Sequence, residues 1–112
     1  ISTMKSKVAQ TMTQVGTPIY MAPEVIKKTR EYSTKVDVYS FGILLIELLT
    51  SKRPYSDLDS FKFPSQIMFA VANGLRPDIP EELPWNLREL IRECLSEEPN
   101  MRPDFPEILK RL

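Results

Sequence analysis

The chain has 112 residues, and its 15 Lys and Arg balance its 15 Asp and Glu to a formal net charge of zero. This balance argues against duplex nucleic acid as a partner, because duplex binding normally recruits clustered basic side chains. A single cysteine, Cys94, and the lack of histidine exclude an internal disulfide and a structural zinc site, which typically needs about four ligands.

The beginning of the chain predicts loop structure rather than regular elements. Residues 1–15 show neither a helical nor a strand period, so we expect a loop there. Pro18 and Pro23 disfavour helix at the residues that precede them, and a short helical turn is expected over residues 24–27. No secretory signal is visible, which favours a cytoplasmic protein or a cytoplasmic domain of a larger one.

Residues 33–51 predict the longest helix of the chain, with Ser33 as its N-cap. Apolar side chains point in nearly every direction around this helix, and a helix that is apolar all round is a buried one. Its longest apolar run, residues 38–49, is interrupted by polar residues and falls well short of the roughly 20 residues of a membrane span. We therefore expect this helix to lie inside the fold, surrounded by other elements.

Three shorter helices are expected after it, over residues 65–72, 85–97 and 104–112. The first ends at Asn73-Gly74, a common kind of C-terminal stop. The other two carry apolar residues at the i, i+3, i+4 spacing of one buried stripe, and Cys94 on such a stripe is expected to be a core thiol. The visible part of the fold is therefore predicted to be all-α.

Asp37 is a charged residue in the first turn of the most apolar helix. A charge in that setting is costly unless it is paired or hydrogen-bonded. One interpretation is a capping acid, since a carboxylate near a helix N-terminus gains from the exposed N–H groups and the helix dipole. The other interpretation is that Asp37 holds a neighbouring loop through its remaining lone pairs.

Two motifs carry a family resemblance: Gly16-Thr-Pro-Ile-Tyr-Met-Ala-Pro-Glu24 and, thirteen residues later, Asp37-Val-Tyr-Ser-Phe-Gly42. Further matching segments follow in the same order: Arg53-Pro-Tyr55, Gly74-Leu-Arg-Pro77 and Arg102-Pro-Asp-Phe105. The chain from about Gly16 to Leu112 resembles the C-terminal lobe of eukaryotic protein kinases, beginning just after their Asp-Phe-Gly motif. It most resembles the tyrosine-kinase-like group, whose members phosphorylate serine and threonine.

The resemblance implies roles for individual residues. Glu24 and Arg102 are expected to form an ion pair that braces the activation segment against the lobe, since the planar guanidinium suits a bidentate carboxylate. Thr17 and Asp37 are expected to support the catalytic loop. The expected substrate-binding residues are Gly16, Pro18, Ile19 and Tyr20. The candidate activation-loop phosphosites are Thr11 and Thr13, because phosphate orders loops by pairing with Arg.

The expected organisation is a partial kinase domain over 1–112, within the α+β protein kinase fold. Residues 1–24 are the expected activation segment and substrate-binding loop, and residues 25–112 the helical C-lobe. ATP and Mg are implied as well, but the chain has no GxGxxG loop, no Asp-Phe-Gly and no His-Arg-Asp. We therefore expect the ATP-binding residues outside this chain, in a part of the domain that precedes Ile1, and no activity from the chain alone.

Three interpretations follow: a portion of an active serine/threonine kinase, which the resemblance favours, a truncated non-catalytic interaction module, and a pseudokinase lobe. The expected partners are a protein substrate and the missing N-terminal part of the kinase domain. Because three short helices give the long helix incomplete cover, we expect the isolated chain to self-associate or to be molten.

Overall fold

A computed structural model describes residues 18–28, 32–56 and 63–112. Its elements, in chain order, are the 3-10 helix η1 (Pro18–Tyr20), α2 (Pro23–Lys27), α3 (Lys35–Thr50), α4 (Pro64–Ala72), α5 (Trp85–Cys94), the 3-10 helix η2 (Pro99–Met101) and α6 (Phe105–Arg111). Every regular element in these ranges is helical, which confirms the all-α prediction. None of these helices has the length and apolar character needed to cross a membrane.

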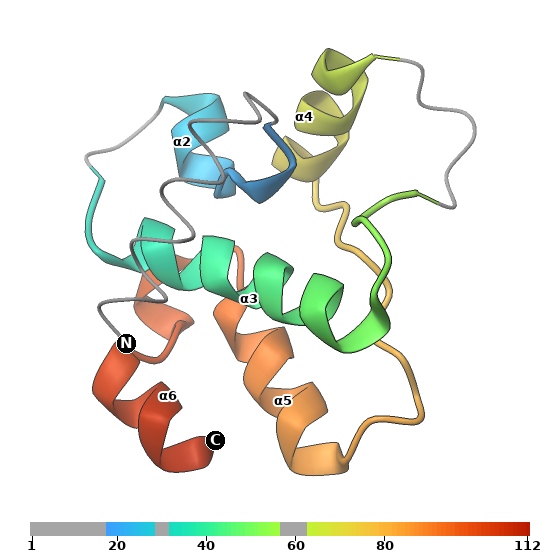
Figure 1. The fold of residues 1–112 in the computed structure, drawn as a ribbon. Helices are drawn as coiled ribbons and strands as arrows, with labels where there is room; N and C mark the ends of the chain where they lie inside the picture. Colours follow the sequence, from blue (N-terminus) through green and yellow to red (C-terminus); the bar gives the residue numbers. More distant parts are fainter. Residues whose placement is uncertain (1–17, 29–31, 57–62) are drawn as a thin grey trace.

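α3 is the central element of the fold. Figure 1 shows it running across the middle of the molecule, with α2 and α4 on one side and α5 and α6 on the other. Residues 38–44 and Ile46 are buried, as expected for a helix that is apolar all round. The prediction that this helix is buried along its whole length was wrong for the last turn, where Leu48 and Leu49 keep 55% and 41% of their area exposed.

Two clusters of buried apolar side chains pack on α3. The larger one joins α3 to η1, α4 and α5 and contains Ile19, Tyr20, Ala22, Tyr39, Ile43, Ile46, Tyr55, Val71, Ile91 and Leu95. The smaller one joins α3 to α5 and α6 and contains Val38, Phe41, Leu90, Cys94 and Ile108. The core therefore lies on both sides of α3 and ties elements from both ends of the chain together.

α3 and α5 approach closely at Gly42. A Cβ atom added to Gly42 would lie 2.9 Å from the Cβ of Cys94 and 2.9 Å from Cδ2 of Leu95. The lack of a side chain is therefore what allows the two helices to pack at this distance. Burial raises the pKa of the Cys94 thiol to about 12, in agreement with the expected core thiol.

The predicted start of the central helix was one residue early. α3 begins at Lys35, with Thr34 at the N-cap position and no capping hydrogen bond from that side chain. Ser33 Oγ accepts a hydrogen bond from the Lys35 N–H at 3.2 Å. The Ser33 hydroxyl therefore bonds the first residue of the helix from the position before the N-cap. The predicted bounds of α2, α4 and α6 agree with the structure to within one residue at each end.

The helix predicted over residues 85–97 ends earlier, at Cys94. Leu95 leaves the helical backbone geometry, with φ −94° and ψ 12°. Its carbonyl oxygen accepts a hydrogen bond from Arg76 Nε at 2.8 Å, and the carbonyl of Ser96 accepts one from Arg102 Nε at 3.0 Å. These two carbonyl groups lie beyond the end of α5, where no N–H of the helix can reach them, and the side chains of Arg76 and Arg102 satisfy them instead.

Candidate functional site

Glu24 and Arg102 form a buried, bidentate ion pair. Arg102 Nη1 and Nη2 each donate to one carboxylate oxygen of Glu24 at 2.8 Å, and the side chains are 0% (Arg102) and 3% (Glu24) exposed. The other donors of Arg102 reach the carbonyl oxygens of Ser96 (3.0 Å) and Lys35 (2.9 Å). Removing two charges from water is costly, and paired geometry with additional hydrogen bonds offsets that cost. The pair joins the first turn of α2 to the chain just after η2.

Two guanidinium groups lie against the buried ring of Tyr39 in α3. The Cζ atoms of Arg76 and Arg102 are each 5.2 Å from the ring centroid, within the range of a cation–π interaction. Burial raises the pKa of Tyr39, although both arginines act to lower it. Arg76 is held further by hydrogen bonds from Nε to Leu95 O and from Nη1 to Leu75 O, each at 2.8 Å. Tyr39 thus packs against both cations.

Glu97, just after α5, contacts two cations at once. Its Oε1 accepts a hydrogen bond from Lys27 Nζ at 2.7 Å, and its Oε2 accepts one from Arg76 Nη2 at 2.9 Å. The three side chains are 46% (Glu97), 38% (Lys27) and 20% (Arg76) exposed. Partial burial acts to raise the pKa of Glu97, but the bonds from Lys27 and Arg76 hold it below the ordinary value. Glu97 is therefore ionised at neutral pH.

η1 is anchored on α3 by side chains from both elements. Ile19 and Tyr20 are buried, at 4% and 3% exposure, within the larger apolar cluster. The Tyr20 hydroxyl donates to the Glu47 carboxylate, and Ser40 Oγ donates to the Tyr20 carbonyl at 2.7 Å. Burial and the contact with Glu47 raise the pKa of Tyr20 to about 12, with Arg53 acting to lower it. The conformation of η1 therefore depends directly on α3.

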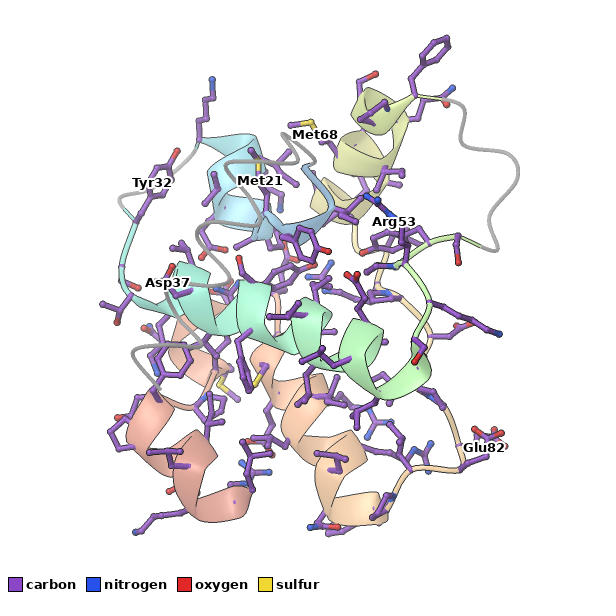
Figure 2. The ribbon with its side chains drawn as sticks, viewed as in Figure 1. Met21, Tyr32, Asp37, Arg53, Met68 and Glu82 are labelled. Atoms are coloured by element: carbon purple, nitrogen blue, oxygen red, sulfur yellow. The ribbon has the colours of Figure 1, made fainter. Side chains whose placement is uncertain are left out.

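Asp37 lies half-buried in the first turn of α3, at the end of that helix near α2 (Figure 2). Its backbone N–H donates to the Thr34 carbonyl at 3.1 Å. Pro18 belongs to η1. Four other positions singled out from the sequence lie outside the described residues: Thr11, Thr13, Gly16 and Thr17. The structure thus brings Glu24 and Arg102 together and places Asp37 and η1 on the same central helix.

The residues of this chain do not fit an ATP–Mg site. In the described ranges, no three His, Cys, Asp or Glu side chains are grouped closely enough to hold a metal ion. The glycines of the chain are too far apart in sequence for a phosphate-covering loop. What the arrangement can do is hold α2 and η1 rigidly against α3.

A sequence model of the protein tyrosine and serine/threonine kinase family matches residues 1–112, the whole chain. The chain belongs to this family. Similar kinases occur in Dictyostelium discoideum: a probable serine/threonine-protein kinase is 44% identical over 113 residues, the probable serine/threonine-protein kinase drkA is 42% identical over 113, and the dual specificity protein kinase shkB is 44% identical over 98. These alignments cover 100%, 100% and 88% of this chain but 12%, 17% and 15% of the relatives.

A solved structure supports the fold as well. The cryo-EM structure of the AtMLKL3 tetramer matches with a TM-score of 0.72 and 35% identity, covering 82% of this chain and 17% of that one. The chain therefore spans less than a fifth of the length of these relatives and of that solved chain.

Sequence reasoning singled out Glu24 and Arg102 as a pair but missed three residues at the same site. Arg76 stood only within a matching motif, and its contact with Tyr39 has no local signal. Glu47 stood only as a polar residue within the apolar run of the central helix, and Glu97 only as the last residue of a predicted helix. Nothing in the residues beside them indicates partners that lie 21 to 70 residues away for Glu97, or 27 residues away for Glu47.

Proposed function

We propose that this chain is the C-lobe portion of a protein serine/threonine kinase, where it supplies the end of the activation segment and the platform for the peptide substrate. The complete domain transfers the γ-phosphoryl group of ATP to a Ser or Thr hydroxyl of a protein. The observation that carries the proposal is the buried pair of Glu24 and Arg102, which attaches the Ala-Pro-Glu end of the segment to the helical core. The relatives named as serine/threonine kinases support the choice of acceptor.

In this proposal α3 is the rigid support. Asp37, in its first turn, and Thr17 hold the catalytic loop, which belongs to the missing part of the domain. The platform for the substrate residue after the phosphoacceptor consists of Gly16, Pro18, Ile19 and Tyr20. Because the side chains of Ile19 and Tyr20 are buried, they act by fixing the shape of η1 rather than by offering a large exposed surface.

ATP and Mg supply the phosphoryl group and neutralise its charge in the complete domain. The contribution of this chain is positional, because a reacting group misplaced by about 1 Å can lose roughly a hundredfold in rate. Phosphorylation of Thr11 or Thr13 belongs to the same proposal, as a way to order the activation segment by pairing with Arg.

The test uses the full-length protein that carries this segment, incubated with ATP, Mg and peptides that offer Ser, Thr or Tyr. We expect phosphate on Ser or Thr, located by mass spectrometry. Glu24→Gln removes the charge with little change of shape and should lower the rate by about tenfold or more. Glu93→Gln is a matched control, because Glu93 also forms a bidentate pair, with Arg111, but at 42% and 27% side-chain exposure.

Each outcome separates the interpretations. Full-length protein that transfers no phosphate to any peptide would contradict the proposal and leave the pseudokinase or non-catalytic interaction module. Phosphate on Tyr alone would contradict the choice of acceptor. Equal losses in Glu24→Gln and Glu93→Gln would contradict the special role of the buried pair.

We also propose that residues 1–112 self-associate when separated from the rest of the domain. Several large apolar side chains on different elements are more than two-fifths exposed: Leu48, Leu49, Phe69, Trp85, Leu109 and Leu112. Exposed apolar surface of this kind favours association. Sedimentation of the isolated chain should show species larger than a monomer, and a monomer that unfolds cooperatively would contradict the idea.

A further inference from the structure

Both ends of the short helix α2 are attached to the part of the chain that follows α5, at Glu97 before η2 and at Arg102 after it. At its first turn, Glu24 is held by Arg102, whose Nε also bonds the Ser96 carbonyl at 3.0 Å. At its last turn, Lys27 Nζ bonds Glu97 Oε1 at 2.7 Å. The two attachments differ in kind, because the first is buried and the second lies at the surface.

The surface attachment has an ordered base. Arg76 bonds the second oxygen of Glu97 at 2.9 Å, and its other donors reach the carbonyl oxygens of Leu95 (2.8 Å), Leu75 (2.8 Å) and Val71 (3.2 Å). Its guanidinium also lies over the buried Tyr39 ring. Arg76 therefore holds Glu97 in one orientation independently of Lys27, which lowers the entropic cost of forming the Lys27–Glu97 contact.

From this geometry we infer that Glu97 is a positioning residue for phosphoryl transfer: with Arg76 it holds Lys27 and so fixes the direction of α2. The inference rests on the proposed function. α2 packs on the larger apolar cluster through Val25 and Ile26, and Glu24 holds its first turn. The Lys27–Glu97 contact adds a polar attachment at the last turn, which limits changes in the direction of the helix axis. η1 precedes α2 by two residues, so a change in the axis of α2 moves the substrate platform.

A residue that positions α2 and a residue that stabilises the fold should respond differently to mutation and to salt. Exposed ion pairs contribute little to the free energy of unfolding, so loss of the Lys27–Glu97 contact should leave stability nearly unchanged. The contact lines an open cleft of about 880 Å³ together with Met101 and Arg92, so dissolved ions reach it. Added salt should therefore weaken it, while the buried Glu24–Arg102 pair is screened much less.

The experiment measures peptide phosphorylation by the full-length protein and its Glu97→Gln and Lys27→Met variants. Each variant should raise KM for the peptide by about two- to fivefold with little change in kcat or melting temperature. The double variant should be no worse than either single one, and Lys27→Arg should retain the wild-type KM. Raising the salt concentration should raise KM for the wild type more than for Glu97→Gln.

Glu89→Gln provides the matched control, because Glu89 forms an exposed ion pair with Arg92 three residues further along α5 and makes no contact with α2 in the described residues. Its KM should equal that of the wild type. An unchanged KM in Glu97→Gln, or an equal rise in Glu89→Gln, would overturn the inference while leaving the proposed function intact.

Amide hydrogen exchange tests the same attachment without any catalytic readout. The N–H of Ile26 bonds Ala22 O at 3.2 Å, and the N–H of Lys28 bonds Glu24 O at 3.0 Å. Hydrogen exchange at these two N–H groups of α2 should be about two- to fivefold faster in Glu97→Gln than in the wild type or in Glu89→Gln. If the protein transfers no phosphate, the proposed function fails, and unchanged exchange would separately overturn the attachment.

Discussion

Replacement of Glu24 by alanine isolates the cost of leaving a buried cation without its partner. The Arg102 side chain is 0% exposed and donates two hydrogen bonds of 2.8 Å to the Glu24 carboxylate. In Glu24→Ala the guanidinium keeps its bonds to the carbonyl groups of Ser96 and Lys35 but loses its counter-charge. Breaking a buried pair in this way typically costs about 3–5 kcal/mol.

That loss is large against the total stability of a domain, which is typically about 5–15 kcal/mol. The assay is denaturant unfolding of the full-length protein, with the change read from the midpoint at constant m value. Glu93→Ala is the control, because the Glu93–Arg111 pair has the same bidentate geometry at 2.8 Å but lies at the surface. We expect the control to lose less than about 1 kcal/mol.

A double-mutant cycle with Arg102→Met completes the test. Once the guanidinium is absent, removing Glu24 should cost far less, so the two losses should not add. Additive losses, or a midpoint for Glu24→Ala within the range of the Glu93→Ala control, would refute the reasoning that burial makes this pair strong.

Three further predictions concern the contacts around α3. Gly42→Ala should destabilise the protein by about 1 kcal/mol or more, because the new methyl would sit 2.9 Å from Cys94 Cβ and overpacking outweighs the gain in helix propensity; an unchanged melting temperature would mean that α5 can shift freely. The Cys94 thiol, with its pKa near 12, should resist alkylation at pH 8 until the protein unfolds, and rapid native-state labelling would contradict its burial. Tyr20→Phe should cost about 1 kcal/mol through the lost bond to Glu47. Because folding raises the pKa of Tyr20 from 10.0 to about 12, its contribution to stability should be complete below pH 10 and decline as the pH rises towards 12, a decline that the Phe variant should lack.

Local patterns were sufficient for most of the helical scaffold. α2, α4 and α6 begin and end within a residue of the expected positions, because prolines, Asn73-Gly74 and apolar stripes act within a few residues of the boundary they set. The 3-10 helices η1 and η2 were not predicted, since three residues are too few to show a period. The early end of α5 was missed because the contacts that hold the residues after it are not local: the carbonyl of Leu95 bonds Arg76, 19 residues before it, and that of Ser96 bonds Arg102, 6 residues after it.

The residues of the candidate site likewise fall into those that the sequence indicated and those that only the structure reveals. Glu24, Arg102 and Asp37 were named because a family pattern marks their positions. Arg76 and Glu97 escaped notice because their importance arises from three-dimensional neighbours, a buried Tyr39 ring and a lysine on another helix. No periodicity in one sequence encodes contacts of that kind.

The Glu24–Arg102 contact should also affect the rates of folding and unfolding. Its partners are 78 residues apart, and long-range contacts form late when loop closure is costly. We expect the folding transition state to contain α3 packed on α5 with the two charges still separated. Glu24→Ala should then leave the folding rate nearly unchanged and speed unfolding by about 10²- to 10⁴-fold, a result that stopped-flow chevrons can check and that a slower folding limb would contradict. The pair therefore forms late in folding, and its strength sets how long α2 and the preceding η1 stay attached to the helical core.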